Sequence, residues 1–401
     1  MSRKFPDTLT DGSSGTPKFQ VAIVGGGISG LVTAIALLKH PGVSIQIYER
    51  AKEFKEIGAS IGLGPNGLRS LEKLGVENAL SGDALLDNVP RDIIHLGKET
   101  IDIEANGNDG VIIHFKDSTS KKADICIGAD GIHSNVRKTF VPTHTLHWTG
   151  WVALRATFEA SRLNDLDFPQ DAAHWIGHDR NFFHSHLGKG LFTAVGGFHV
   201  DPSSPNAPGR DAKWNGLGSL EQFKEFYKDW NPTIMGFIEA CPSIRLFPNF
   251  AGSALERWSF NDRVTLVGDA AHTHGGAFAA GGSLAIDDAY ALYLALNHVW
   301  PASTYRTEKP TKYQISEIFR IYEATRKPHI NKILGVVHKA IAGQKADVKT
   351  GETETEEQLR QRVLQRMDPE WISEHDVEAA FQEIIGKIGV IQELHEPRHR
   401  L

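Results

Sequence analysis

The chain of 401 residues carries a formal net charge of −6, from 43 Lys and Arg against 49 Asp and Glu. This mildly acidic balance provides no basic field that would draw the protein to nucleic acid or to an anionic membrane. Hydrophobic residues at 40% and charged residues at 23% are typical of a soluble globular protein, and the length predicts two closely connected domains. The two cysteines, Cys126 and Cys241, are too few for a disulfide framework or a cysteine metal site.

Neither end of the sequence predicts export. Residues 1–18 are polar and rich in Ser, Thr, Asp and Gly, which is typical of a disordered arm and lacks the apolar core of a secretion signal. Residues 395–401 match no targeting signal. Residues 21–38 are uncharged and long enough for a membrane helix, but three glycines follow a β-branched run there, so we expect strand, turn and helix instead. A cytoplasmic location is therefore expected.

Residues 19–50 form the strongest pattern in the chain, that of a dinucleotide-binding βαβ unit. The apolar run at 21–24 predicts a strand, 28–39 predicts a helix, and 44–48 predicts a second strand that leads to Glu49. The turn after the first strand has the G-x-G-x-x-G spacing, made by Gly25, Gly27 and Gly30. An acidic residue about 20 positions further on completes the signature. The alternative is an ordinary βαβ unit with a glycine-rich turn.

Each residue of this pattern has a physical role in holding a dinucleotide. Gly25 permits the tight turn, and Gly27 lets the backbone approach a pyrophosphate. Gly30 lets helix and strand pack closely, while the free N–H groups at the start of the helix face the phosphates. Glu49 would accept hydrogen bonds from an adenosine ribose.

A second glycine-rich stretch, 62–67, is a poor candidate for another nucleotide site. Its preceding strand is short, and Pro65 removes an N–H from the turn that should hold a phosphate. We interpret it as a loop and helix near the ligand.

The rest of the chain predicts strands and helices in alternating blocks. Short strands are expected within 93–127 and 148–200 and at 264–267. Helices are expected at 220–241, 283–296, 315–340 and 357–388, and a charged, mobile segment at 346–356. This order implies that two domains share the chain discontinuously.

A third motif lies in residues 268–289. The strand at 264–267 delivers Gly268 and Asp269 into a turn, and a long helix begins after Gly281, Gly282 and Ser283. This arrangement gathers a carboxylate, small residues and free helix N–H groups around one ligand. The alternative is a glycine-rich connection before a core helix.

Three motifs in this order, GGGISG with Glu49, GADGIHSNVR at 128–137 and GDAAH at 268–272, carry a family resemblance. From Gln20 to His338 the chain resembles the single-component FAD-dependent aromatic hydroxylases, which are the salicylate hydroxylase-like and para-hydroxybenzoate hydroxylase-like flavoprotein monooxygenases. The resemblance implies an α/β fold with a Rossmann-like FAD-binding domain, a β-sheet substrate domain and a helical C-terminal region. The expected division is 18–145 and 251–300 for the FAD-binding domain, 146–250 for the substrate domain and 301–401 for the helical region.

The resemblance also implies roles for individual residues. Gly25, Gly27 and Gly30 would hold the FAD pyrophosphate, Glu49 the adenosine ribose, and Arg50 would flank the adenine. Asp130 would serve FAD and the transient NAD(P)H, and Asp269, next to Gly268 in the same motif, would bind the ribityl chain. Gly281, Gly282 and Ser283 would present backbone N–H groups to the flavin ring, where a positive helix end stabilises negative charge on reduced flavin.

The reaction that the resemblance implies needs no metal and no protein nucleophile. NAD(P)H gives a hydride to the flavin, dioxygen forms a C4a-hydroperoxide, and the distal oxygen is transferred to an electron-rich ring carbon. The protein must exclude water and hold the aromatic substrate. The expected partners are therefore a small aromatic molecule and O2, with neither nucleic acid nor membrane, and the oligomeric state stays open.

Substrate-site residues are less determined by the sequence. Strand alternation places Trp151, Ala153 and Arg155 on one face, and Arg155 matches an arginine that some relatives place in the substrate pocket. A guanidinium there could pair with a phenolate or carboxylate, and the alternative is a solvent-facing strand arginine. His274, in the flavin motif, could face the substrate, whereas His272 fits a structural role. His184 and His186 share a strand face and are more typical of ordinary strand histidines than of acid–base groups.

Two departures from the family pattern affect the prediction. Relatives usually carry proline in the turn after GDAAH, where this chain has Thr273-His274-Gly275-Gly276. Relatives also carry several dozen more residues where this chain runs from Leu80 to Leu85, including part of the substrate sheet and a helix arginine that contacts FAD.

The alternatives to hydroxylation are epoxidation of an electron-rich double bond, such as an indole 2,3-bond, and FAD binding without turnover. A flavin halogenase would carry a Trp-x-Trp-x-Ile-Pro motif, which is absent.

Overall fold

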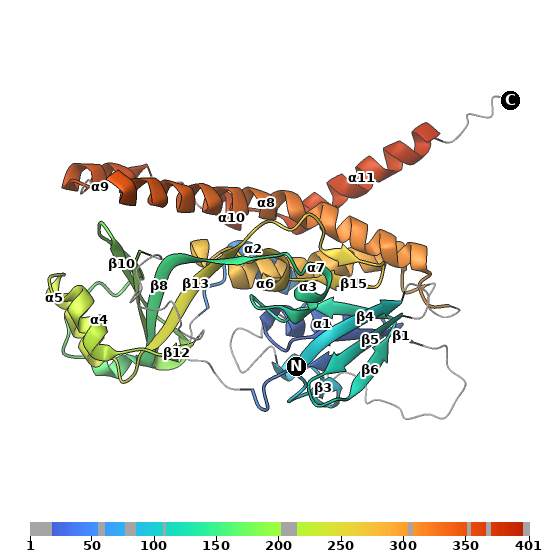
Figure 1. Ribbon diagram of the computed structural model, residues 1–401, viewed down its shortest axis with the longest axis horizontal. Coiled ribbons are helices and arrows are strands. Elements are labelled where there is room, and N and C mark those ends of the chain that lie inside the picture. The colour runs from blue at the N-terminus through green and yellow to red at the C-terminus, as the bar shows by residue number, and fades with distance from the viewer. Residues whose placement is uncertain are drawn as a thin grey trace.

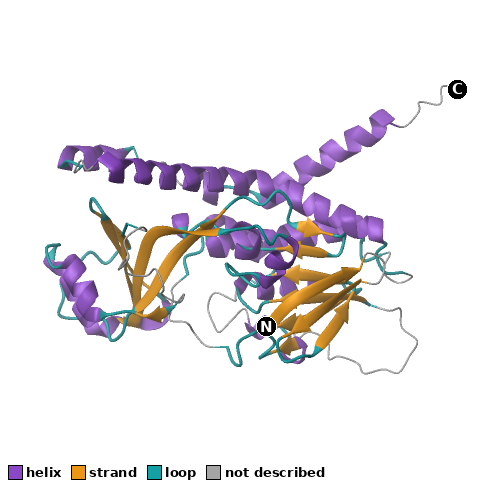
Figure 2. Cartoon of the chain, viewed as in Figure 1, coloured by secondary structure: helices purple, strands orange, loops and turns teal. Residues whose placement is uncertain are grey.

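The computed structural model describes residues 18–54, 61–76, 86–106, 110–201, 215–303, 308–350, 354–365 and 370–395. The strands of these residues form two six-stranded sheets and one three-stranded sheet. The two large sheets lie side by side, and a long helix, α8 (Lys312–Thr350), runs past both of them (Figure 1). Figure 2 shows strands in two separate groups, with helices packed beside each. The structure is therefore mixed α/β, as predicted from the sequence.

The first sheet is mainly parallel and contains the strand of the glycine motif near its centre. Its strands, in order across the sheet, are β14 (Ser259–Phe260), β15 (Val264–Leu266), β7 (Ile125–Gly128), β1 (Phe19–Val24), β2 (Val43–Tyr48) and β3 (Ile94–His95). β1 pairs in parallel with β2 and β7, and its side chains are almost all buried. A continuous apolar run such as 21–24 is what a parallel strand covered on both faces requires.

Helices and a small antiparallel sheet cover this first sheet. The helices are α1 (Ile28–Leu38), α2 (Pro65–Lys73), α3 (Asn135–Phe140), α6 (Asp269–His272) and α7 (Gly281–Val299). The small sheet consists of β4 (Thr100–Asn106), β5 (Gly110–Phe115) and β6 (Ser120–Ala123). α7 packs against α1, α2 and α8, so it lies at the centre of this half of the molecule. As expected, the second glycine-rich stretch leads into a helix, which begins at Pro65.

The second large sheet is antiparallel and is covered on one face by two helices. Its strands, in order, are β12 (Gly216–Leu217), β13 (Arg245–Gly252), β8 (Leu146–Glu159), β11 (Leu191–His199), β10 (Arg180–His186) and β9 (Ala173–Ile176). The helices are α4 (Leu220–Tyr227) and α5 (Pro232–Ala240). The core between them is aromatic, with Phe182, Phe192, Phe223 and Phe237 each fully buried.

The predicted elements need three corrections. The helix expected at 220–241 is two helices, because Pro232 starts α5 and the Asn231 side chain caps it by accepting from the Thr233 N–H at 2.9 Å. α8 continues to Thr350, through residues that were expected to be mobile. β13 was not predicted at all. The N-terminal arm and the short segment at 80–85 lie outside the described residues, except for Lys18.

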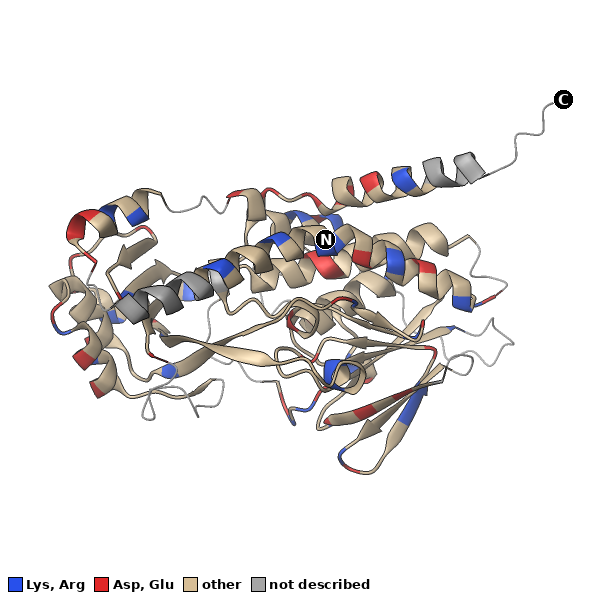
Figure 3. Cartoon of the chain, turned by 45° about the horizontal axis from the view of Figure 1, so that its top comes forward, with Lys and Arg blue, Asp and Glu red and all other residues tan. Residues whose placement is uncertain are grey.

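The C-terminal region is helical, with α9 (Glu356–Leu364), α10 (Glu370–Ser373) and α11 (Val377–His395) following α8. Figure 3 shows charged residues of both signs interspersed along α8 and α11. Among the described helices, none is long and apolar enough to cross a membrane.

Candidate flavin site

All three sequence motifs meet at one edge of the first sheet. β1, β7 and β15 are neighbouring parallel strands, so their carboxyl ends lie together. Each strand leads directly into one motif, at Gly25, Ala129 and Gly268 respectively. This edge is where open parallel sheets bind their ligands.

The three glycines of the first motif have three different environments. Gly25 has φ +109°, and a Cβ there would lie 2.3 Å from the Ala129 carbonyl oxygen. A Cβ on Gly30 would lie 1.9 Å from the Gly25 carbonyl oxygen, so the turn and α1 can be this close only with glycine. A Cβ on Gly27 would meet nothing within 4 Å, and Gly27 caps the start of α1. Two of these positions are closed by protein, and the third opens at the helix N-terminus.

Glu49 lies beside this turn and contacts its backbone. Its Oε2 accepts from the Gly26 N–H and its Oε1 from the Ala51 N–H, both at 2.7 Å. A carboxylate has about four acceptor positions, so ribose hydroxyls could still bind. Arg50 is exposed next to it. Burial lowers the pKa of His133, and the charge of Arg50 lowers it further, which places Arg50 near the GADGIH turn.

Asp130 closes the other side of the glycine turn. Its Oδ2 accepts from the backbone N–H groups of Asn135 and Val136 at 2.7 and 3.1 Å, in the first turn of α3. Burial raises the pKa of the Asp130 carboxyl, although these hydrogen bonds oppose the shift. Its Oδ1 is buried without a hydrogen-bond partner. A buried acceptor left unpaired at a ligand edge fits a site that is completed by a cofactor.

The Asp269 turn is fixed through its backbone, which leaves its carboxylate free to face outward. The Asp269 carbonyl accepts from Thr273 Oγ1 at 2.7 Å and from Arg137 Nη1 at 3.2 Å. Its side chain is 48% exposed. Gly268 has φ +59°, and a Cβ there would lie 2.1 Å from Ser29 Oγ on α1. The turn therefore touches the helix that follows the first motif.

A buried charged network holds this turn from below. Asp288 Oδ2 accepts from the Gly268 N–H at 2.8 Å and lies 2.6 Å from His272 Nε2, while Asp288 Oδ1 accepts from Arg326 Nε at 2.8 Å. Burial would raise the pKa of the Asp288 carboxyl, but the charges of His272 and Arg326 outweigh it and the pKa lies below its usual range. Sequence reasoning named His272 but missed Asp288 and Arg326. The signal was an Asp pair in the apolar helix at 283–296, since buried carboxylates need partners.

The start of α7 faces the same edge. No side chain caps this helix, so its first N–H groups are left for water or a ligand. Ser283 Oγ accepts from the Gly64 N–H at 2.8 Å, and a Cβ on Gly282 would lie 2.9 Å from Ile61 Cγ2. The second glycine-rich stretch thus packs on the start of α7, which agrees with its interpretation as a loop near the ligand.

Arg155 lies on the face of the second sheet opposite α4 and α5, and Trp151, Ala153 and Arg155 share this face as strand alternation predicted. Its guanidinium carbon lies 5.1 Å from the centre of the Phe247 ring, and its Nε has no hydrogen-bond partner. Burial lowers the pKa of this guanidinium. A half-buried arginine with an unpaired Nε is a poor fit to a solvent-facing strand arginine.

The other histidines separate into two environments. His274 is buried next to the flavin motif; both ring nitrogens lack partners, and its Nδ1 lies 4.0 Å from Asp269 Oδ1. Burial lowers the His274 pKa, which favours the neutral ring. His184 is fully buried on the opposite face of the sheet from Arg155, 4.6 Å from the Phe237 ring, and His186 is exposed.

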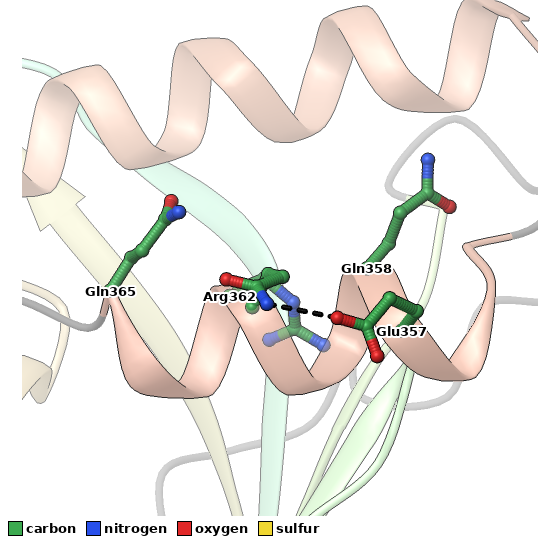
Figure 4. Close-up of a pocket in the computed structure, with 5 residues that line it drawn as sticks. Glu357, Gln358, Arg362 and Gln365 are labelled. Atoms are coloured by element: carbon green, nitrogen blue, oxygen red, sulfur yellow. Dashed lines mark hydrogen bonds between the residues drawn. The ribbon is translucent and has the colours of Figure 1, made fainter.

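A shallow pocket on α9 lies away from all of these residues. It is lined by Glu357, Gln358, Gln361, Arg362 and Gln365 (Figure 4). Arg362 pairs with Glu354 at 2.7 Å and donates to the Gly177 carbonyl at 3.1 Å. The hydrogen bond to Gly177 therefore fastens α9 to the end of β9 in the second sheet.

Comparisons with known proteins match the chain to flavin enzymes. A family model described as an FAD binding domain matches residues 18–114 and 245–308. Salicylate hydroxylase from Pseudomonas putida is 27% identical over 462 residues, covering 97% of this chain and 98% of that protein. 6-Hydroxynicotinate 3-monooxygenase from Pseudomonas fluorescens is 26% identical over 368 residues, covering 80% of this chain and 90% of that protein.

Solved structures show the same fold. A salicylate hydroxylase substrate complex has a TM-score of 0.69 at 22% identity, covering 92% of this chain and 98% of that chain. HpxO from Klebsiella pneumoniae, complexed with FAD and uric acid, has a TM-score of 0.67 at 22% identity, covering 92% of this chain and 97% of that chain. With the matched FAD-binding domain and the relatives along most of its length, the chain is similar to the salicylate hydroxylase-like aromatic hydroxylases and is an FAD-dependent monooxygenase.

Proposed function

We propose that the protein hydroxylates an aromatic or heteroaromatic small molecule, with NAD(P)H as reductant and O2 as oxidant. The observation that carries this proposal is the meeting of the open Gly27 turn, the outward Asp269 carboxylate and the uncapped start of α7 at one sheet edge. The second sheet provides a half-buried, unpaired Arg155 for an anionic aromatic molecule. We further propose that the two large sheets mark the FAD-binding and substrate domains.

The overall reaction balances without a metal. An aromatic C–H, O2, NAD(P)H and a proton give an aromatic C–OH, NAD(P)+ and water. When bound, FAD supplies the redox chemistry, because it accepts two electrons from NAD(P)H and passes them to O2. One oxygen atom enters the ring and the other leaves as water.

The protein's own groups would bind, orient and shield the reactants. The proposed cofactor residues are Gly25, Gly27, Gly30, Glu49, Arg50, Asp130, Gly268, Asp269, Gly281, Gly282 and Ser283. Arg155 would hold an anionic group of the substrate, since a guanidinium pairs with a carboxylate through two parallel hydrogen bonds. His274, buried and favoured as a neutral ring, would offer one donor and one acceptor nitrogen close to Asp269.

The test starts from the purified protein loaded with FAD. NADH or NADPH oxidation should rise when a hydroxylated aromatic acid is added, and product formed under ¹⁸O2 should carry one labelled oxygen. Phenols, salicylates, hydroxynicotinates and indoles form the first panel, and a labelled epoxide-derived product from an indole would indicate the alternative reaction. Oxidation without a labelled product would contradict the proposal.

A second candidate, FAD binding without turnover, has one observation in its favour. The alignment with salicylate hydroxylase is 462 residues long, longer than this chain of 401, so the relative carries segments that this chain lacks. If such a segment completes the substrate pocket, the protein would bind FAD and consume no NAD(P)H with any aromatic compound of the panel.

A further inference from the structure

The strands β8 and β13 lose register at one point where they pass between the two sheets. Val152 pairs with Pro248 and Trp148 pairs with Phe250, so three residues of β8 stand opposite Asn249 alone. Gly150, in the middle of the three, has φ +83°. This is a β-bulge, a feature that bends a strand and redirects side chains and is frequent beside active sites.

The bulge is fixed by hydrogen bonds. Thr149 Oγ1 donates to the Asn249 carbonyl at 3.0 Å and accepts from the Trp151 N–H at 3.2 Å. The Gly150 carbonyl accepts from the Val200 N–H at 2.9 Å, which ties the bulge to the strand on its other side. The position of Asn249 is therefore held by its backbone, and its side chain is not needed to maintain the bulge.

The Asn249 side chain reaches the turn of the flavin motif. A Cβ on Gly276 would lie 3.5 Å from Asn249 Nδ2 and 3.6 Å from Asn249 Oδ1. Asn249 is half-buried, and within the described part of the chain its amide makes no hydrogen bond. The amide thus offers one acceptor and two donor hydrogens next to the flavin turn.

Asn249, Phe247 and Arg155 form a row along the face of the second sheet opposite α4 and α5. Asn249 and Phe247 are two residues apart on one strand, which places them on the same face and about 7 Å apart. Phe247 pairs with Ala153, and the Arg155 guanidinium lies 5.1 Å from its ring centre. Phe247 is itself buried, so the row offers an amide next to the flavin turn and a cation further out.

We propose that Asn249 determines substrate specificity by hydrogen bonding a hydroxyl or carbonyl group of an aromatic acid whose carboxylate is held by Arg155. The ring of the substrate spans the distance from Arg155 to Asn249, and its polar substituent lies next to the flavin turn. This inference rests on the proposed function and adds the class of substrate, an aromatic acid with a polar ring substituent.

The experiment measures binding of matched pairs of ligands to the full-length, FAD-loaded protein. The pairs are 4-hydroxybenzoate with benzoate, salicylate with benzoate, and 6-hydroxynicotinate with nicotinate. Dissociation constants come from quenching of tryptophan fluorescence, since Trp151 lies in the bulge. We expect one hydroxylated ligand to bind about five- to tenfold more tightly than its parent, as a single net hydrogen bond gives.

The variants identify which residue provides the preference. Asn249→Leu, similar in size, should abolish the preference for the hydroxylated member, and Arg155→Met should weaken both members of the pair by the same factor. Asn164→Leu, the same change at an exposed asparagine of the second sheet's domain, should leave both constants unchanged. Flavin absorbance after gel filtration should be equal in all variants.

Two results would overturn the inference. One is a hydroxyl preference that survives in Asn249→Leu, and the other is an absence of binding by every aromatic acid of the panel. Failure of the proposed function looks different, because the FAD-loaded protein would then consume no NAD(P)H with any compound of the panel. Fluorescence still reports the ligand preference in that case, so the two failures are distinguishable.

Discussion

Buried polar groups behave differently in the two halves of the molecule. Beneath the flavin edge, Asp288 has partners on both oxygens, and all of these groups are buried. In the second sheet and at its border, Arg155 Nε and both ring nitrogens of His274 have no partner. The Asp288 carboxylate holds the architecture because both of its oxygens are paired, although His272 Nδ1 and Arg326 Nη1 in the same network have no partner. Arg155 and His274 lie beside the ligand edge, where an unpaired group retains its capacity to bind.

The strongest test of this comparison removes the paired Asp288 carboxylate. Asp288→Ala leaves the fully buried Arg326 guanidinium without its nearest carboxylate and the Gly268 N–H without its acceptor. Loss of one partner of a buried ion pair costs about 3–5 kcal/mol in the free energy of unfolding. Urea denaturation measures this loss, and we expect reduced FAD retention as the Asp269 turn loosens.

A matched control is the exposed pair on α8, Glu317 with Arg320 at 2.6 Å. Glu317→Ala should change the free energy of unfolding by less than about 1 kcal/mol, because an exposed ion pair is screened by solvent. Equal losses in the two variants would contradict the distinction between network and surface pairs.

Two glycines of the first motif show a similar difference between scaffold and site, because the space beside Gly25 is filled by protein and the space beside Gly27 is open. Gly25→Ala places a methyl group against the Ala129 carbonyl at positive φ, so we expect a loss of roughly 1–3 kcal/mol in folding stability together with loss of FAD. Gly27→Ala adds a methyl group to open space and should lower FAD affinity while leaving the urea midpoint unchanged. A stability loss in Gly27→Ala would show that the space is not kept for a ligand.

Local sequence predicted the parts of the site that obey local rules. The first motif was predictable because strand, turn, helix and acid each follow from neighbouring residues. The turn of Gly268 and Asp269 and the helix start at Gly281 were likewise located from one continuous segment. At these places, propensity and tertiary structure agree.

The rest depends on contacts between distant residues. β13 was missed because Pro248 argues against a strand, and its pairing partner lies about a hundred positions earlier in β8. The bulge that places Asn249 therefore has no local signature. The pairing of Asp288 with Arg326 spans 38 positions, and the burial of His184 follows from α5 packing on the sheet. Alternation assigned a face to His184, but not which face would be covered.

Replacing the unpaired Arg155 guanidinium should weaken substrate binding without lowering folding stability. Arg155→Met removes a half-buried cation with an unpaired Nε, so the free energy of unfolding should stay constant or rise slightly. Binding of an aromatic carboxylate should weaken by roughly 10- to 100-fold, since a charged hydrogen bond contributes about 1.5–3 kcal/mol. Arg155→Lys should restore only part of this affinity because an ammonium lacks the planar fork. Unchanged affinity in Arg155→Met would return this residue to a structural role.

A stacked pair of histidines lies away from the ligand edge and yet contains buried nitrogen atoms without partners. The rings of His329 on α8 and His375 near α11 lie 3.9 Å apart and almost parallel, and the Nε2 atoms of both are buried without partners. Burial lowers the pKa of His329 to about 2 and of His375 to about 4. The charge of Arg326 contributes to both shifts.

These shifts make folding stability depend on pH in a defined direction. The unfolded chain binds protons at His329 and His375 near pH 6.5, whereas the folded chain binds them only near pH 2 and 4. Between pH 6.5 and 4 the unfolded state therefore holds more protons, and the free energy of unfolding falls as pH falls. Urea denaturation at pH 7.5 and 5.5 should show the decline, and His375→Phe should reduce it by about 1 kcal/mol, because one proton-binding difference is removed. An unchanged decline in His375→Phe would mean that the folded protein protonates His375 as readily as the unfolded chain does.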